Sequence, residues 1–147
     1  MTDYGVVVMS QLHQQPSMMT APELAQATGL PAPTVSKLLK QLAKAGVLDS
    51  HRGVNGGYTL SRALEDVTAM EIIEALDGPL ALTACVEGAD DACNVESLCP
   101  MKGGWDKVNA AIRNALCEVT LADLCPTQDY PAMEPQLSKK TATRGGA

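Results

Sequence analysis

The sequence predicts a mainly α fold with a small β wing, in which a winged helix-turn-helix domain is followed by a long helix. Three observations support this prediction. Short helical patterns separated by Pro and Gly fill residues 4–45, a glycine-rich hairpin pattern follows at 52–57, and a second amphipathic pattern begins near residue 103. At 147 residues, the chain is long enough for one compact domain with appendages.

Three helices are predicted before the hairpin. Helical spacing of apolar residues indicates the first over residues 4–14. Thr20 and Glu23 form a capping-box pattern that opens a second helix, which ends at Gly29. Prolines at 31 and 33 suit the first turn of a third helix, so the second and third helices form a helix-turn-helix around Gly29. The third helix carries an apolar stripe expected to face the core: Val35, Leu38, Leu39, Leu42 and Ala45.

The wing is predicted from two short strand-like runs, 47–48 and 58–60, on either side of residues 52–57. Gly56 and Gly57 are expected to supply positive φ for the hairpin. The alternative is an unrelated helical hairpin followed by a loop. The order of helix, turn, amphipathic helix and glycine hairpin favours the wing.

A second capping box, formed by Thr68 and Glu71, starts a fourth helix that ends at Asp77-Gly78, with Ile72, Ile73 and Leu76 inward. Residues 79–104, rich in Gly, acids and Cys, are here termed the cysteine segment. A long helix over 103–119 then carries the apolar residues Trp105, Val108, Ile112, Leu116 and Val119. A short capped helix is expected at 120–124, and residues 126–147 are expected to be a disordered tail.

Charge is divided unevenly along the chain. Residues 1–64 carry five Lys or Arg against three acids, whereas residues 65–147 carry six against fourteen, so the net charge of −6 arises in the second half. Because basic residues cluster in the first half, we expect an anionic partner to bind there. Apolar residues make up 46% of the chain and Phe is absent, so a globular core must be built mainly from aliphatic side chains.

The third helix and the wing are the predicted DNA-reading elements. In a helix-turn-helix, the start of the second helix of the motif enters the major groove, where short polar and basic side chains reach base edges. Later basic residues pair with phosphates, and a wing arginine suits a narrow minor groove. The alternative is an ordinary solvated face. The candidates are Thr34, Ser36 and Lys37 for bases, Lys40 and Lys44 for phosphates, and Arg52 for the minor groove.

Five cysteines occur in a chain that begins without a signal-peptide pattern, so metal binding or redox chemistry is favoured over a disulfide framework. Cys85, Cys93 and Cys99 have C-x7-C-x5-C spacing on a predicted loop, from which three thiolates can converge on one metal. Structural zinc more often shows closely paired cysteines. Spacing alone leaves an iron–sulfur cluster, zinc and free thiols as alternatives.

Several motifs together resemble the IscR/NsrR-type family of winged-helix regulators. They are the run from Leu38 to Leu48, the Arg52-Gly53-x2-Gly56-Gly57-Tyr58 hairpin, the three-cysteine loop, and Thr120-Leu121-Ala122-Asp123-Leu124. The sequences around Cys85 and Cys99 look closest to the branch that regulates SUF iron–sulfur assembly. The resemblance covers roughly residues 2–124.

The resemblance implies a homodimer that binds double-stranded operator DNA and represses iron–sulfur assembly genes. Its cluster, with 2Fe–2S favoured and 4Fe–4S as the alternative, would be bound by Cys85, Cys93 and Cys99. The implied divisions are a DNA-binding domain over 1–64, a linking helix and cluster loop over 65–102, a dimerisation helix over 103–125, and the tail over 126–147. Trp105 is expected to be a packing anchor on the dimerisation helix.

A cluster held by three thiolates needs a fourth ligand. IscR has a His three residues after its last cysteine, but Lys102 occupies that position here and a cation is not a ligand. NsrR relatives use an Asp in a Thr-Asp pair near the N-terminus of the other subunit, which Thr2-Asp3 matches, so Asp3 is the candidate. The alternatives are that Asp3 caps the first helix, or that Glu87 or Glu96 is the ligand. The family has more residues before this pair, so we expect that the chain starts late.

Other protein classes fit the sequence less well. An enzyme is not expected, nor a small-molecule substrate, because there is no C-x-x-C and both histidines, His13 and His51, lie in the DNA-binding half. Redox, zinc or nitric-oxide sensing, or a cluster scaffold, are the alternatives to cluster sensing. No apolar run approaches the length of a membrane span, so we expect a cytoplasmic protein. Cys117 is expected to pack in the long helix and Cys125 to be exposed.

Overall fold

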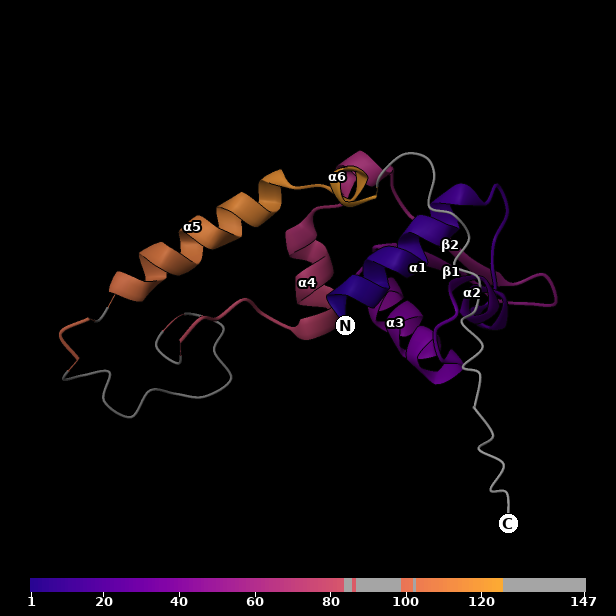
Figure 1. The fold of residues 1–147 in the computed structure, drawn as a ribbon, viewed down its shortest axis with the longest axis horizontal. Coiled ribbons are helices and arrows are strands. Elements are labelled where there is room, and N and C mark those ends of the chain that lie inside the picture. Colours follow the sequence, from indigo (N-terminus) through magenta and orange to yellow (C-terminus); the bar gives the residue numbers. More distant parts are fainter. Residues whose placement is uncertain (84–85, 87–98, 102, 126–147) are drawn as a thin grey trace, which may run out of the picture.

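The structure is a computed structural model that describes residues 1–83, 86, 99–101 and 103–125. It is mainly helical with a two-stranded antiparallel sheet, which confirms the predicted fold class (Figure 1). The predictions for Cys85, Cys93, Glu87, Glu96, Lys102 and the tail 126–147 lie outside the described residues. In chain order the elements are α1 (Thr2–Gln14), α2 (Ala21–Thr28), α3 (Ala32–Lys44), β1 (Leu48–His51), β2 (Gly57–Leu60), the 3-10 helix η1 (Leu64–Asp66), α4 (Ala69–Asp77), α5 (Gly104–Glu118) and α6 (Leu121–Leu124).

The helix-turn-helix formed by α2 and α3 begins at the predicted capping box. The Thr20 hydroxyl accepts from the Glu23 amide, and the Glu23 carboxylate accepts from the Thr20 amide at 2.7 Å. Gly29 ends α2 in the left-handed region with φ of 71°, as its lack of a Cβ allows. The prediction for Ala45 was wrong: Ala45 is the exposed C-cap of α3, because the helix ends at Lys44.

The wing is the β1–β2 hairpin, paired from Leu48–Leu60 at its base to His51–Gly57 at its tip. The expected conformational role of its glycines was wrong. Positive φ occurs at Gly53, not at Gly56 or Gly57. Instead, a Cβ at Gly56 would contact the His51 carbonyl oxygen, and one at Gly57 would lie 2.9 Å from the carbonyl oxygen of Met19, so close backbone approach requires both glycines.

The core lies between α1, α3 and α4, with α2 and the sheet completing it (Figure 1). Leu38, Leu39 and Leu42 of α3 are fully buried, as the stripe predicted. Ile72 and Leu76 of α4 point inward as expected, whereas Ile73 is half-buried. The remaining large core side chains are Val8, Met9, Leu12, Leu24, Val35, Val47, Leu48, Leu64, Val67, Met70 and Leu121.

The long helix α5 extends away from the bundle of α1 to α4 (Figure 1). After α5 the chain returns to the bundle, where Leu121 of α6 is fully buried and the Leu121 amide donates to the Val67 carbonyl. Both predictions for the cysteines outside the loop were wrong. Cys117 is exposed on α5, whereas Cys125 is buried because it directly follows α6, which packs on the core. Among the described residues, no helix is long and apolar enough to cross a membrane.

Candidate nucleic-acid interface and cysteine segment

The outer face of α3 carries three lysines. Lys37, Lys40 and Lys44 are exposed on the side opposite the buried leucines, because positions three and four apart share a helix face. Thr34 and Ser36, in the first turns of the same helix, are half-buried. On α3 the two short polar candidates therefore lie near the start of the helix and are half-buried, whereas the three lysines are exposed along its outer face.

Arg52 lies at the exposed tip of the wing. Between this tip and the start of α2 there is an open groove of about 530 Å³, lined by Thr20, His51, Arg52 and Tyr58 among others. Within the part of the chain that the structure describes, neither Arg52 nor the three lysines of α3 forms an ion pair. These four cations are thus available to an anionic partner.

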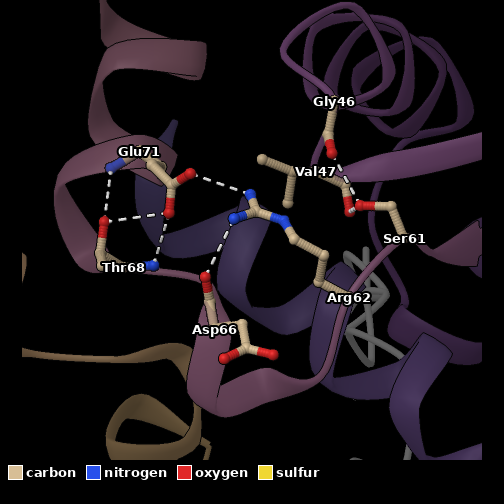
Figure 2. Close-up of polar contacts among 7 residues, drawn as sticks. All are labelled: Gly46, Val47, Ser61, Arg62, Asp66, Thr68 and Glu71. Atoms are coloured by element: carbon tan, nitrogen blue, oxygen red, sulfur yellow. Dashed lines mark hydrogen bonds and ion pairs between the residues drawn. The ribbon is translucent and has the colours of Figure 1, made fainter.

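Arg62, the remaining basic residue of the first half, is bound within the fold instead (Figure 2). Its guanidinium donates to the Asp66 carbonyl at 3.0 Å and to the Glu71 carboxylate at 2.9 Å. Glu71 also accepts from the amide and hydroxyl of Thr68, which completes the capping box of α4. Burial acts to raise the pKa of Glu71, but the bonds from Thr68 and Arg62 outweigh it and hold the pKa below 4.5. Arg62 therefore joins the end of the wing to the start of α4.

The described ends of the cysteine segment lie between α4 and α5. Cys99 is a free, half-buried thiol just before the turn that leads through Gly103 into α5, and Val86 is buried. Among the described residues, no group of three His, Cys, Asp or Glu side chains is positioned to hold a metal. Since two of the three candidate cysteines lie outside these residues, the proposed ligand set stays a prediction.

Asp3 lies in the first turn of α1, where its exposed carboxylate is 3.4 Å from the N-terminal amine. It is not the N-cap, which is Met1 without a side-chain capping bond. A hydrogen bond from the Tyr4 amide, followed by the terminal amine, holds the pKa of Asp3 below its ordinary value. The Thr2 hydroxyl donates to Asp77, so this end of α1 lies beside the end of α4, where the cysteine segment begins.

Comparison with known proteins decides the family. The family model Rrf2, described as "Iron-dependent Transcriptional regulator", matches residues 1–127. The chain belongs to the Rrf2 family. It is therefore a winged helix-turn-helix transcriptional regulator and not an enzyme, as predicted from the sequence.

Three relatives of this Rrf2-family protein illustrate the match. An rrf2-like HTH-type transcriptional regulator of Rhodobacter capsulatus is 32% identical over 113 residues, which are 74% of this chain and 75% of the relative. The structure of CymR, the global cysteine regulator of B. subtilis, has a TM-score of 0.62 at 27% identity and covers 87% of this chain and 95% of its own. That of T. potens IscR has a TM-score of 0.58 at 31% identity and covers 84% and 81%.

The sequence did not predict a role for one residue of this Rrf2-family protein. Asn109 of α5 is 9% exposed and forms hydrogen bonds with the backbone of Leu80 and Leu82 at the start of the cysteine segment. The signal that could have revealed it is a polar residue one turn after Trp105, within an amphipathic helix. The same helix is joined to α4 by Arg113, which donates to Glu74 at 2.6 Å.

Proposed function

We propose that this Rrf2-family regulator acts in the cytoplasm as an iron–sulfur cluster-sensing repressor of iron–sulfur assembly genes, those of the SUF system in particular. It binds double-stranded operator DNA as a homodimer, and cluster occupancy changes its affinity for the operator. The observation that carries the proposal is that one chain combines four cations, Lys37, Lys40, Lys44 and Arg52, that form no ion pair with any described residue, with a three-cysteine segment that precedes α5 in the sequence. The proposed chain has a DNA-binding domain over 1–64, a linking helix and cluster loop over 65–102, a dimerisation helix over 103–125 and a tail over 126–147.

The donor set fits an iron–sulfur cluster. Cys85, Cys93 and Cys99 would supply three thiolates, the soft ligands that such clusters prefer. When bound, the cluster supplies a centre whose presence depends on iron and sulfide, with 2Fe–2S favoured over 4Fe–4S. Cys99 is free and half-buried, so the described part of the segment leaves its thiol available as a ligand.

Asp3 is the proposed fourth ligand. Its side chain is 75% exposed, so the carboxylate is accessible, and a carboxylate is ionised at neutral pH, as a ligand must be. The start of α1 lies beside Asp77, the last residue of α4, shortly before the cysteine segment begins. In a homodimer this carboxylate can serve either its own segment or that of the partner.

On the DNA side, α3 would enter the major groove with Thr34, Ser36 and Lys37 near base edges. Lys40 and Lys44 would neutralise phosphates, and Arg52 would enter the adjacent minor groove. Substituting Arg52 with Ala should weaken operator binding without changing iron content. Equal affinity of variant and wild type would refute the role of the wing.

The homodimer is supported by the apolar side chains that α5 leaves uncovered. Trp105 is 36% and Val108 is 42% exposed, and on α1 Tyr4 and Val7 are 43% and 46% exposed. Exposed apolar surface of this kind is typical of a protein interface. Val108→Asp should produce a monomer in sedimentation experiments; a stable dimer would refute the role of α5.

A second candidate function is regulation by redox state, nitric oxide or zinc at the same thiols. The similarity to the structure of CymR favours this candidate, because CymR has the same fold and is a global cysteine regulator. The two functions differ in the change at the thiols that alters DNA affinity: loss or gain of an iron–sulfur cluster in the first, and oxidation, nitric oxide or zinc in the second.

The test is operator affinity with and without the cluster. DNA fragments are first selected from a random pool by the anaerobic protein, and binding is then measured for the iron-loaded protein, the chelator-treated protein and Cys99→Ser. The proposal predicts that chelation changes affinity and that Cys99→Ser matches the chelated protein. Cys117→Ser is the control, since Cys117 is an exposed cysteine outside the three-cysteine set. Equal affinity of loaded and chelated protein would refute cluster sensing.

A further inference from the structure

Asn109 makes two hydrogen bonds to the backbone at the start of the cysteine segment. Its Nδ2 donates to the Leu80 carbonyl at 2.9 Å, and its Oδ1 accepts from the Leu82 amide at 3.3 Å. In an extended chain, the carbonyl of one residue and the amide two residues later face the same side, so one side-chain amide can satisfy both. Asn109 thus holds two backbone groups that lie two residues apart with one side-chain amide.

These bonds join the two ends of the cysteine segment. Leu80 and Leu82 lie at its start, whereas Asn109 lies on the helix that follows its end. The two hydrogen bonds therefore join two points of the chain that lie on either side of the three candidate cysteines in the sequence. Closing a loop in advance removes part of the conformational entropy that its thiols lose when they bind one group together.

Other contacts also join α5 to its own chain, since α5 packs against α4 and the Ala69 amide donates to the carbonyl of Val119, the residue after α5. Arg113 pairs with Glu74, but their side chains are 47% and 33% exposed, and a solvent-exposed ion pair stabilises a contact only weakly. Trp105 and Val108 are exposed. An apolar residue at 109 would fill the same space without burying a polar group, so the amide is favourable there only through its two bonds.

We propose that Asn109 is a positioning residue that holds the start of the cysteine segment on α5 and thereby slows the loss of the metal group held by the thiols. The second part rests on the proposed cluster function; the first part does not. Asn109 binds neither the metal nor DNA in this account. It acts through the backbone of Leu80 and Leu82.

The test compares two variants with a control. Asn109→Leu keeps a similar size and removes both hydrogen bonds, whereas Asn109→Asp keeps the acceptor for the Leu82 amide and loses the donor to Leu80. The control is Asn114→Leu, because Asn114 is exposed on the same helix. In metal-free protein, amide hydrogen exchange of Leu82 measures local opening, and the fluorescence of Trp105, the single tryptophan, reports on the same helix.

We expect exchange at Leu82 to be roughly tenfold faster in Asn109→Leu, since one lost net hydrogen bond corresponds to about that factor. Asn109→Asp should be intermediate, the Trp105 emission should shift to the red, and Asn114→Leu should match wild type. Unchanged exchange and emission in both Asn109 variants would overturn the positioning role. If Asn109→Leu does not fold, Asn109→Asp gives the same decision.

The metal-dependent part is tested by the decay of visible absorbance in air after anaerobic reconstitution with iron and sulfide. Asn109→Leu should lose its absorbance roughly tenfold faster than Asn114→Leu, in proportion to the faster opening. Equal decay together with faster Leu82 exchange would overturn the effect on metal loss. A wild-type protein that takes up no iron would instead refute the proposed function, and exchange at Leu82 would still decide the role of Asn109.

Discussion

Replacing Lys40 with Gln should reduce the salt dependence of DNA binding by a calculable amount. Lys40 is exposed on the outer face of α3 and forms no ion pair within the described residues, so its charge is available to a phosphate. Gln keeps much of the side-chain length without the charge. Because Lys40 has no fixed partner there, the free energy of unfolding should change by less than about 0.5 kcal/mol.

The magnitude follows from counterion release. Each phosphate contact contributes about 0.9 to the slope of log K against log salt concentration, so one lost contact in each half of the proposed dimer lowers the slope by about 1.8. Over a fourfold increase in salt, from about 50 to about 200 mM, wild type should therefore lose roughly tenfold more affinity than the variant.

The assay is fluorescence anisotropy with a labelled operator at several salt concentrations. Lys107→Gln is the matched control, since Lys107 is an exposed lysine on α5 and not on α3. Its slope should equal that of wild type. A Lys40→Gln slope indistinguishable from wild type would refute the placement of this residue on a phosphate.

Three further predictions concern stability and thiol chemistry. Gly5→Ala should destabilise the fold by about 1 kcal/mol in urea unfolding, because the new methyl group would collide with the buried Leu76 side chain at a cost that exceeds the gain in helix propensity. In a Leu76→Ala background the same change should be stabilising. A stabilising effect of Gly5→Ala in the wild-type background would contradict this prediction. Because the pKa of Glu71 is lowered in the folded state, its carboxylate stabilises the fold at pH values above the ordinary carboxyl pKa near 4.5, and this stabilisation is lost as the pH falls through the folded-state pKa. Glu71→Gln should therefore reduce the fall in the free energy of unfolding at acidic pH. An unchanged fall would argue against the Arg62 and Thr68 bonds. Burial raises the pKa of the Cys125 thiol despite a hydrogen bond with Ser10, so iodoacetamide should label the exposed Cys117 much faster than Cys125 at neutral pH. Mass spectrometry measures the two rates. Equal rates would place Cys125 at the surface.

Local signals explain why so much of the fold could be predicted from the sequence. The boxes at Thr20 and Thr68 need only residues three positions apart, and the stripe of α3 needs only helical periodicity. The structure confirms these features. Each capping box is stabilised by hydrogen bonds within one helical turn, and the α3 stripe is stabilised by burial in the core. The lysines of α3 were found by the same periodicity.

The errors concern residues whose environment is created by distant parts of the chain. Gly57 is required by the approach of the Met19 backbone, and Cys125 is buried because α6 returns to the bundle. Asn109 was missed because its partners, Leu80 and Leu82, lie on the far side of the cysteine segment. Such contacts depend on tertiary packing, which spacing along the sequence does not reveal.

The most direct test of the central claim is the amount of iron and acid-labile sulfide bound per monomer in protein purified without oxygen. The account predicts a coloured protein that contains both, and predicts that Cys85→Ser, Cys93→Ser and Cys99→Ser each lose them whereas Cys117→Ser does not. A colourless wild-type protein that contains zinc, and neither iron nor sulfide, would contradict it.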